Sequence, residues 1–141
     1  MEYMDTYADT AKKETLEEAG AEVELRGILR MEHSLSISGA RQRVVFYAEP
    51  VDPDKPLKSV PDEESLGAKW LSLDEIREKQ KIPPPEGMRG PEIMIWSSYI
   101  EKGGPIFPLS VLSSRENAPC DPAESAMVVP RGAPLALVGK E

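Results

Sequence analysis

Proline is distributed unevenly along this chain, and its distribution limits where regular structure can form. The sequence of 141 residues holds 14 prolines, and Pro50 is the first of them. Because proline lacks a backbone N–H and disrupts helix interiors and central strands, the stretch before Pro50 can hold long helices and strands. We therefore predict a structured domain over residues 1–112 and a mostly disordered tail over 113–141, where prolines recur without a sustained hydrophobic period.

Composition and charge are those of a soluble globular protein and exclude several functions. Charged residues make up 30% of the chain, hydrophobic residues 40%, and the net charge is −8. An acidic surface repels nucleic acid backbones and anionic membranes, so we expect neither a nucleic acid polymer nor a membrane as a partner. A single cysteine, Cys120, excludes an internal disulfide and a cysteine-based zinc site. The N-terminus lacks the basic start and apolar run of a signal peptide, which predicts a cytoplasmic protein.

The first predicted element is a helix over residues 6–19. Alanine, leucine, lysine and glutamate dominate this segment, and Gly20 follows it where a helix C-terminus favours glycine. At 100° per residue, one broad arc of the helix is apolar, and we expect this arc to be its buried face. Its members are Tyr7, Ala8, Ala11, Thr15, Leu16 and Ala19.

Strands are predicted after this helix. Residues 21–32 alternate in places and indicate one strand or two short ones, with Gly27 as a bulge. Residues 33–40 read as a turn region, and residues 41–49, β-branched and aromatic at their centre, as the clearest strand. The order of helices and strands predicts the α/β class.

The second half begins with a proline-punctuated loop and then a strand over residues 67–73. Ser72 and Glu75 have the spacing of a capping box, which predicts a helix over residues 73–80. A further helix is predicted over 91–102, with proline in its first turn.

Three glutamates in the first helix are the most informative residues for function. Glu14, Glu17 and Glu18 are spaced i, i+3, i+4, so their carboxylates share one helix edge beside the apolar arc. Like charges at these spacings, near the negative end of the helix dipole, destabilise a helix by a few tenths to about 1 kcal/mol each. A bound divalent cation would remove that penalty, since hard cations favour clustered carboxylate oxygens. The alternative, a solvated acidic helix face, stays open on spacing alone.

The segment K-E-T-L-E-E-A-G resembles the second half of the Nudix box, R-E-U-x-E-E-x-G-U, in which U is a bulky aliphatic residue. The resemblance continues through strand, turn and strand to A-K-W-L-S-L-D-E-I, and covers about residues 5–112. It implies an α/β/α sandwich with a mixed sheet, and Mg²⁺ or Mn²⁺ held by Glu14, Glu17 and Glu18. These glutamates would be both the metal ligands and the catalytic residues. The implied activity is hydrolysis of a nucleoside diphosphate derivative or a related small phosphorylated metabolite.

The sequence departs from the Nudix pattern at several positions. Lys13 stands where the family has arginine, and lysine cannot make the bidentate ion pair of a guanidinium. Thr15 and Ala21 replace bulky aliphatic residues, and the family's glycine-rich loop would precede Met1. We therefore expect a fold that lacks the family's N-terminal strands. An alternative function is a catalytically silent domain that binds metal, nucleotide or a protein partner.

Other residues are weaker candidates. Arg30, Arg41 and Arg43 could bind substrate phosphates or only balance nearby acids. Exposed strand edges make a homodimer a candidate assembly. Each remaining candidate has a functional and a structural interpretation. His33 could contact a phosphate or simply end a strand. Glu63 and Glu64 could supply a general base or belong to a solvated loop, and Trp96 and Tyr99 could stack on a base or pack in the core.

Overall fold

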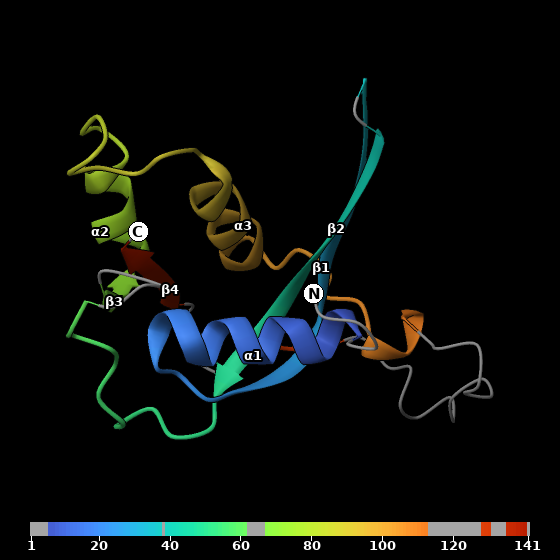
Figure 1. The fold of residues 1–141 in the computed structure, drawn as a ribbon, viewed down its shortest axis with the longest axis horizontal. Helices are drawn as coiled ribbons and strands as arrows, with labels where there is room; N and C mark the ends of the chain where they lie inside the picture. The colour runs from blue at the N-terminus through green and yellow to red at the C-terminus, as the bar shows by residue number, and fades with distance from the viewer. Residues whose placement is uncertain (1–5, 38, 62–66, 113–127, 131–134, 141) are drawn as a thin grey trace. The chain divides into compact units, whose positions relative to one another are not determined.

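The structure is a computed structural model that describes residues 6–37, 39–61, 67–112, 128–130 and 135–140. The chain divides into two compact units, each described by itself below. The hairpin unit comprises Met1–Glu14, Glu22–Pro53 and Pro105–Val129, and the helical unit comprises Thr15–Ala21, Asp54–Gly104 and Pro130–Glu141. The boundary between Glu14 and Thr15 falls within the first helix, which Figure 1 labels α1.

Helix α1, Tyr7–Ala19, confirms the first predicted helix. It begins with a reciprocal cap, because the Asp9 N–H donates to Thr6 Oγ1 at 3.1 Å and the Thr6 N–H donates to Asp9 Oδ2 at 3.2 Å. The Thr6 hydroxyl also donates to the same carboxylate oxygen at 2.6 Å. The two hydrogen bonds that Thr6 donates to this carboxylate lower the pKa of Asp9.

The predicted apolar arc of α1 is only in part its less exposed face. Ala19 is buried, and Tyr7 and Ala11 are half-buried. Leu16 is 48% exposed, so its assignment to the buried face is wrong. The 100° periodicity fixes which residues share a face, whereas burial depends on what packs against that face.

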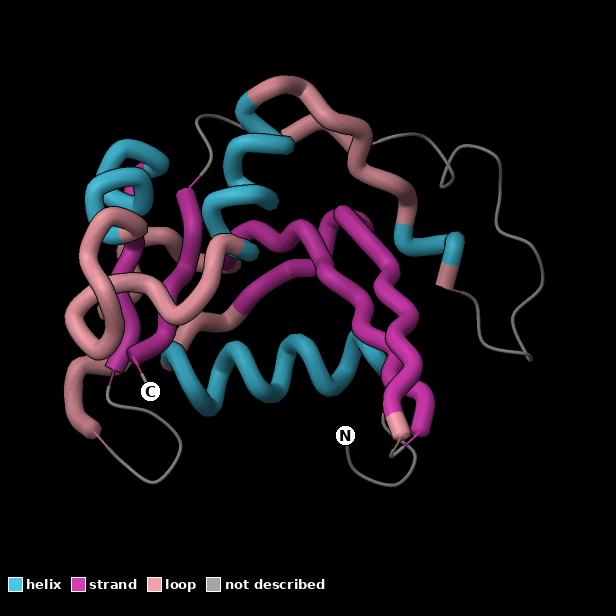
Figure 2. Tube along the Cα trace, turned by 90° about the horizontal axis from the view of Figure 1, so that it is seen from above, coloured by secondary structure: helices cyan, strands magenta, loops and turns pink. Residues whose placement is uncertain are grey.

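The hairpin unit is built on two long antiparallel strands, β1 (Val23–Ser36) and β2 (Gly39–Pro50). They lie side by side along their whole length (Figure 2). The predicted turn lies within residues 33–40, as expected, but it is shorter than predicted, since both strands continue as far as the Ser36–Gly39 pair. The register shifts between Leu25 and Gly27, next to the predicted bulge, and again after Ile28.

The buried residues of this hairpin lie in the N-terminal half of β1. Val23, Leu25 and Ile28 are buried, whereas every residue of β2 is exposed or half-buried. Phe107 pairs with the edge of β1 that faces away from β2. The Ile28 N–H donates to Phe107 O at 2.8 Å, and the Phe107 N–H donates to Ile28 O at 2.9 Å. Gly27 permits this approach, because a Cβ there would lie 2.6 Å from Ile106 Cγ2.

The helical unit contains strand β3 (Gly67–Ser72), helix α2 (Leu73–Lys79) and helix α3 (Glu92–Glu101). The predicted capping box is confirmed, since Ser72 caps α2 and the Glu75 carboxylate accepts from the Ser72 N–H at 2.8 Å. Arg77 then joins the two helices through Asp74 on α2 (2.7 Å) and Glu101 on α3 (2.8 Å). The core of this unit includes Leu71, Leu73 and Ile76.

Strand β4, Leu135–Lys140, corrects part of the tail prediction. We predicted disorder here, but β4 pairs antiparallel with β3 from Gly67–Lys140 to Ser72–Leu135. Val128 also bridges to Ile106. Residues 113–127, 131–134 and 141 lie outside the described residues, so the prediction for them stays untested.

The α/β class is confirmed. The described strands form two antiparallel pairs, β1–β2 and β3–β4, and not the single mixed sheet that we expected. The sandwich arrangement stays a prediction. The described helices include none long and apolar enough to cross a membrane.

Candidate functional site

The three candidate metal ligands lie on one edge of α1. Glu14, Glu17 and Glu18 are all exposed. Within the described ranges, no group of three or more histidine, cysteine, aspartate or glutamate side chains is positioned to hold a metal ion. The helix therefore brings the three carboxylates to one edge, but their side chains do not converge on a common point.

Lys58, which we did not predict from the sequence, binds the C-terminal end of α1. Its backbone N–H donates to Ala19 O at 2.9 Å, and its ammonium donates to Glu17 O at 2.7 Å. The last carbonyls of a helix lack intrahelical donors and carry partial negative charge, which a cation stabilises. The backbone of Glu17 is thus held from a loop 41 residues away in sequence, so no local pattern could reveal this contact.

Gly20 lets the Lys58 loop approach the helix end. Its φ is +67°, the left-handed conformation typical of the residue after a helix. A Cβ at this position would lie 3.0 Å from the Lys58 nitrogen and 3.3 Å from its Cβ. Gly67 also lies close to this loop, since a Cβ added to Gly67 would lie 3.1 Å from Lys58 O. Two structural features therefore require glycine at position 20 of the E-x-x-E-E-x-G segment, namely its positive φ and the close approach of Lys58.

The three candidate substrate-binding arginines share one face of the hairpin. Arg41 and Arg43 are two residues apart on β2, and Arg43 faces Glu32 across the ladder. Arg30 lies two residues from Glu32 on β1 and binds it at 3.1 Å, while Arg43 binds the same carboxylate at 2.5 Å. Arg41 is exposed. One glutamate thus balances the charge of two of the three arginines, which fits the charge-balance interpretation for Arg30 and Arg43. Phosphate binding by these arginines stays a prediction.

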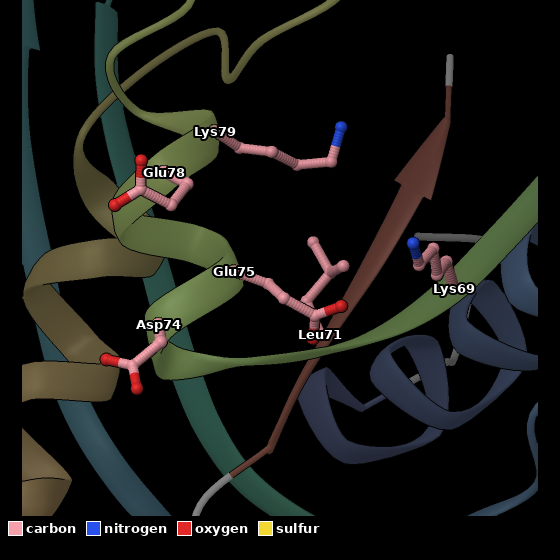
Figure 3. Close-up of a pocket in the computed structure, with 6 residues that line it drawn as sticks. All are labelled: Lys69, Leu71, Asp74, Glu75, Glu78 and Lys79. Atoms are coloured by element: carbon pink, nitrogen blue, oxygen red, sulfur yellow. The ribbon is translucent and has the colours of Figure 1, made fainter.

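An open recess lies on the helical unit, and none of the residues that line it was predicted for a site. Its volume is about 360 Å³, and Leu71 forms part of its lining. Figure 3 shows the ammonium groups of Lys69 and Lys79 on the same side of α2 as the Glu75 carboxylate. That carboxylate is already bound to Ser72, which lowers the pKa of Glu75. Asp74 and Glu78 complete the lining, so the recess carries mixed charge and selects for neither sign.

The weaker candidates take structural positions or lie outside the description. His33 is exposed and faces Gln42 across the hairpin. Trp96 and Tyr99 are half-buried on α3, and the Tyr99 ring packs against Gly104, where an added Cβ would lie 2.5 Å from the ring. Glu63 and Glu64 fall in the segment 62–66, outside the described residues.

Comparison with known proteins gives one match. The family model of the NUDIX domain matches residues 1–89, which include α1, the hairpin and α2. Comparisons with curated proteins and with solved structures find no match. The matched part is more than half of the chain and contains the E-x-x-E-E-x-G segment with the Lys58 loop that binds it. On this evidence the chain belongs to the Nudix family.

Proposed function

We propose that this chain is a divalent-metal-dependent Nudix hydrolase that cleaves a nucleoside diphosphate derivative or a related small phosphate compound. One observation carries the proposal: three carboxylates share an edge of α1 within the part of the chain that the NUDIX domain matches. Nudix hydrolases in general use divalent metals, and carboxylates on one helix edge are the kind of ligand that such a metal favours.

The donor set suits Mg²⁺ or Mn²⁺ in its chemistry, since both are hard cations that favour carboxylate oxygens. Because Glu14, Glu17 and Glu18 are exposed and do not converge, binding requires their side chains to change rotamer. We therefore expect weak binding, with an entropic penalty for ordering three long side chains. When bound, the metal would neutralise phosphate charge and activate the attacking water.

Two features of the chain would support this chemistry. Lys58 holds the backbone of the last turn of α1, so Glu17 and Glu18 project from a fixed helix end. On the hairpin, the guanidinium groups of Arg30, Arg41 and Arg43 could donate charge-assisted hydrogen bonds to phosphate oxygens.

A catalytically silent metal- or nucleotide-binding domain is the second candidate function. The observation that favours it is the lack of a converged carboxylate cluster among the residues that the structure describes. Lys13, in place of the family's arginine, favours it as well.

Turnover and metal binding together separate the two candidates. The full chain would be incubated with Mg²⁺ or Mn²⁺ and a panel of nucleoside diphosphate derivatives, and the release of phosphate and mononucleotide measured. The E17Q/E18Q variant should lose both turnover and the metal-induced rise in melting temperature. E22Q, which replaces an exposed glutamate outside the triplet, is the matched control and should keep both the turnover and the metal-induced rise in melting temperature.

A metal-induced rise that E17Q/E18Q abolishes, without turnover on any substrate, would support the silent domain. A wild-type chain with neither a metal response nor turnover would overturn both candidates. An unchanged metal response in E17Q/E18Q would exclude the glutamates as ligands.

A further inference from the structure

Strand β2 has the composition of a central strand but the exposure of an edge strand. Its middle, Val44 to Tyr47, is β-branched and aromatic, yet none of these four side chains is buried. In contrast, the N-terminal half of β1 contains three buried aliphatic residues. In the described part of the chain, β1 is the strand that pairs with β2, and no other strand lies along its second edge. Backbone groups along such an edge are a template for another strand.

The charges along β2 are arranged asymmetrically. Arg41 and Arg43 lie in its first half and Glu49 near its end, and all three share one face because they are an even number of residues apart. A second β2 that pairs in parallel register would oppose arginine to arginine and glutamate to glutamate. An antiparallel β2 would oppose unlike charges. Compared with in-register parallel pairing, the charges of this strand therefore favour the antiparallel direction.

We propose that two copies of this chain associate through antiparallel pairing of their β2 strands, centred on Val45. In this register Arg41 of each copy faces Glu49 of the other, and Arg43 faces Tyr47, where a guanidinium can lie over the aromatic ring. On the opposite face Val44 meets Phe46, an apolar pair of the kind that stabilises adjacent strands.

The pairing is compatible with the contacts that the hairpin already makes. Glu49 lies 3.5 Å from Arg26 and accepts from the Tyr47 hydroxyl at 3.3 Å, and a carboxylate can accept further hydrogen bonds from a second guanidinium. Arg41 is exposed, opposite Ser34. The result is a four-stranded antiparallel sheet, β1–β2–β2–β1. In it the second β2 edge of each copy pairs with that of the other copy through a twofold, self-complementary contact.

Charge reversal tests the proposal on the full chain, with mass measured by analytical ultracentrifugation across a concentration series. The wild type should form dimers. R41E and E49R should each weaken the dimer by about tenfold or more, because each places two pairs of like charges across the interface. K55E and E86R reverse exposed charges outside β2 and should leave association unchanged.

A mixing experiment distinguishes this register from loss of folding. When R41E and E49R are mixed in equal amounts, both contacts across the mixed interface join opposite charges, so heterodimers should form. The double variant R41E/E49R should dimerise by itself for the same reason.

A monomeric wild type would overturn the proposal. So would single reversals that leave dimerisation intact, or a mixture that stays monomeric although circular dichroism shows both variants folded. Weakening by E49R alone would overturn the Val45 register in favour of one that opposes Arg43 to Glu49.

Discussion

Gly20 shows how a single residue of the E-x-x-E-E-x-G segment serves structure. Its positive φ disfavours any side chain, and Lys58 occupies the space that a Cβ would enter. Gly103, after α3, has a similar φ of +73° but no atom within 4 Å of an added Cβ. The two glycines therefore separate the conformational requirement from the packing requirement.

We predict that G20A destabilises the protein more than G103A. G103A should lower the free energy of unfolding by about 1–2 kcal/mol, the usual strain of a left-handed residue with a side chain. G20A adds a contact at 3.0 Å with backbone, which must shift, so its effect should be larger. Urea denaturation of both variants measures the difference. Equal losses would show that the Lys58 loop yields freely.

Lys58 acts on the same helix end through its ammonium group. We predict that K58M, which keeps the aliphatic stem, lowers the free energy of unfolding by about 1 kcal/mol through loss of the Glu17 carbonyl contact and of the favourable charge at the helix end. The loss should diminish in high salt, because the charge interaction is screened. K55M, an exposed lysine of the same loop, is the control and should have little effect. A loss in K58M that salt does not change would exclude the dipole interaction.

At the scale of elements, helix starts were readable in the sequence. The Ser72–Glu75 box was predicted from spacing and is present, because both partners lie within one turn and depend on nothing distant. The Thr6–Asp9 cap follows the same logic with aspartate in place of glutamate. The hairpin was read less well, because the residues over 33–40 become strand only through pairing with a partner across the ladder.

We predict an acid-sensitive stability contribution from the Glu75 cap. The backbone and side-chain hydrogen bonds of Ser72 lower the pKa of Glu75 below its usual value of 4.5, with Lys69 acting in the same direction. A lowered folded-state pKa stabilises the fold above the unfolded pKa, and this contribution is lost as the pH falls below 4.5 through the folded pKa. The difference in urea midpoint between wild type and E75Q should therefore shrink on acidification. A difference that is constant with pH would contradict this cap.

For the whole molecule, strand β4 decides whether the end of the chain is dispensable. It pairs with all six residues of β3, and in the described part of the chain it is the strand that pairs with β3. Deletion of residues 131–141 should destabilise the helical unit by several kcal/mol, at about 0.5–1.5 kcal/mol for each ladder bond lost. Amide exchange at Lys69 and Leu71 should accelerate in the same variant.

The control for this deletion is a chain that lacks only Glu141, which lies beyond β4. It should unfold as the wild type does. If the deletion of 131–141 leaves the urea midpoint unchanged, the β3–β4 pairing contributes nothing to stability, and this part of the tail is dispensable for folding.

The sequence by itself determined what depends on neighbours within one or two helical turns. It predicted α1 and its end at Gly20, the capping box of α2, and the spacing that brings Glu14, Glu17 and Glu18 to one helix edge. Family membership follows from the same local segment and is confirmed by the match over residues 1–89.

Only the tertiary structure decided what depends on distant segments. It bound Lys58 to the end of α1, paired β4 with β3, and brought Arg30 and Arg43 together on Glu32. The physical reason is that a strand ladder or a helix C-terminus is satisfied by whichever donor the fold brings to it. Sequence spacing fixes directions along one element, whereas the partner across space is chosen when the loops close.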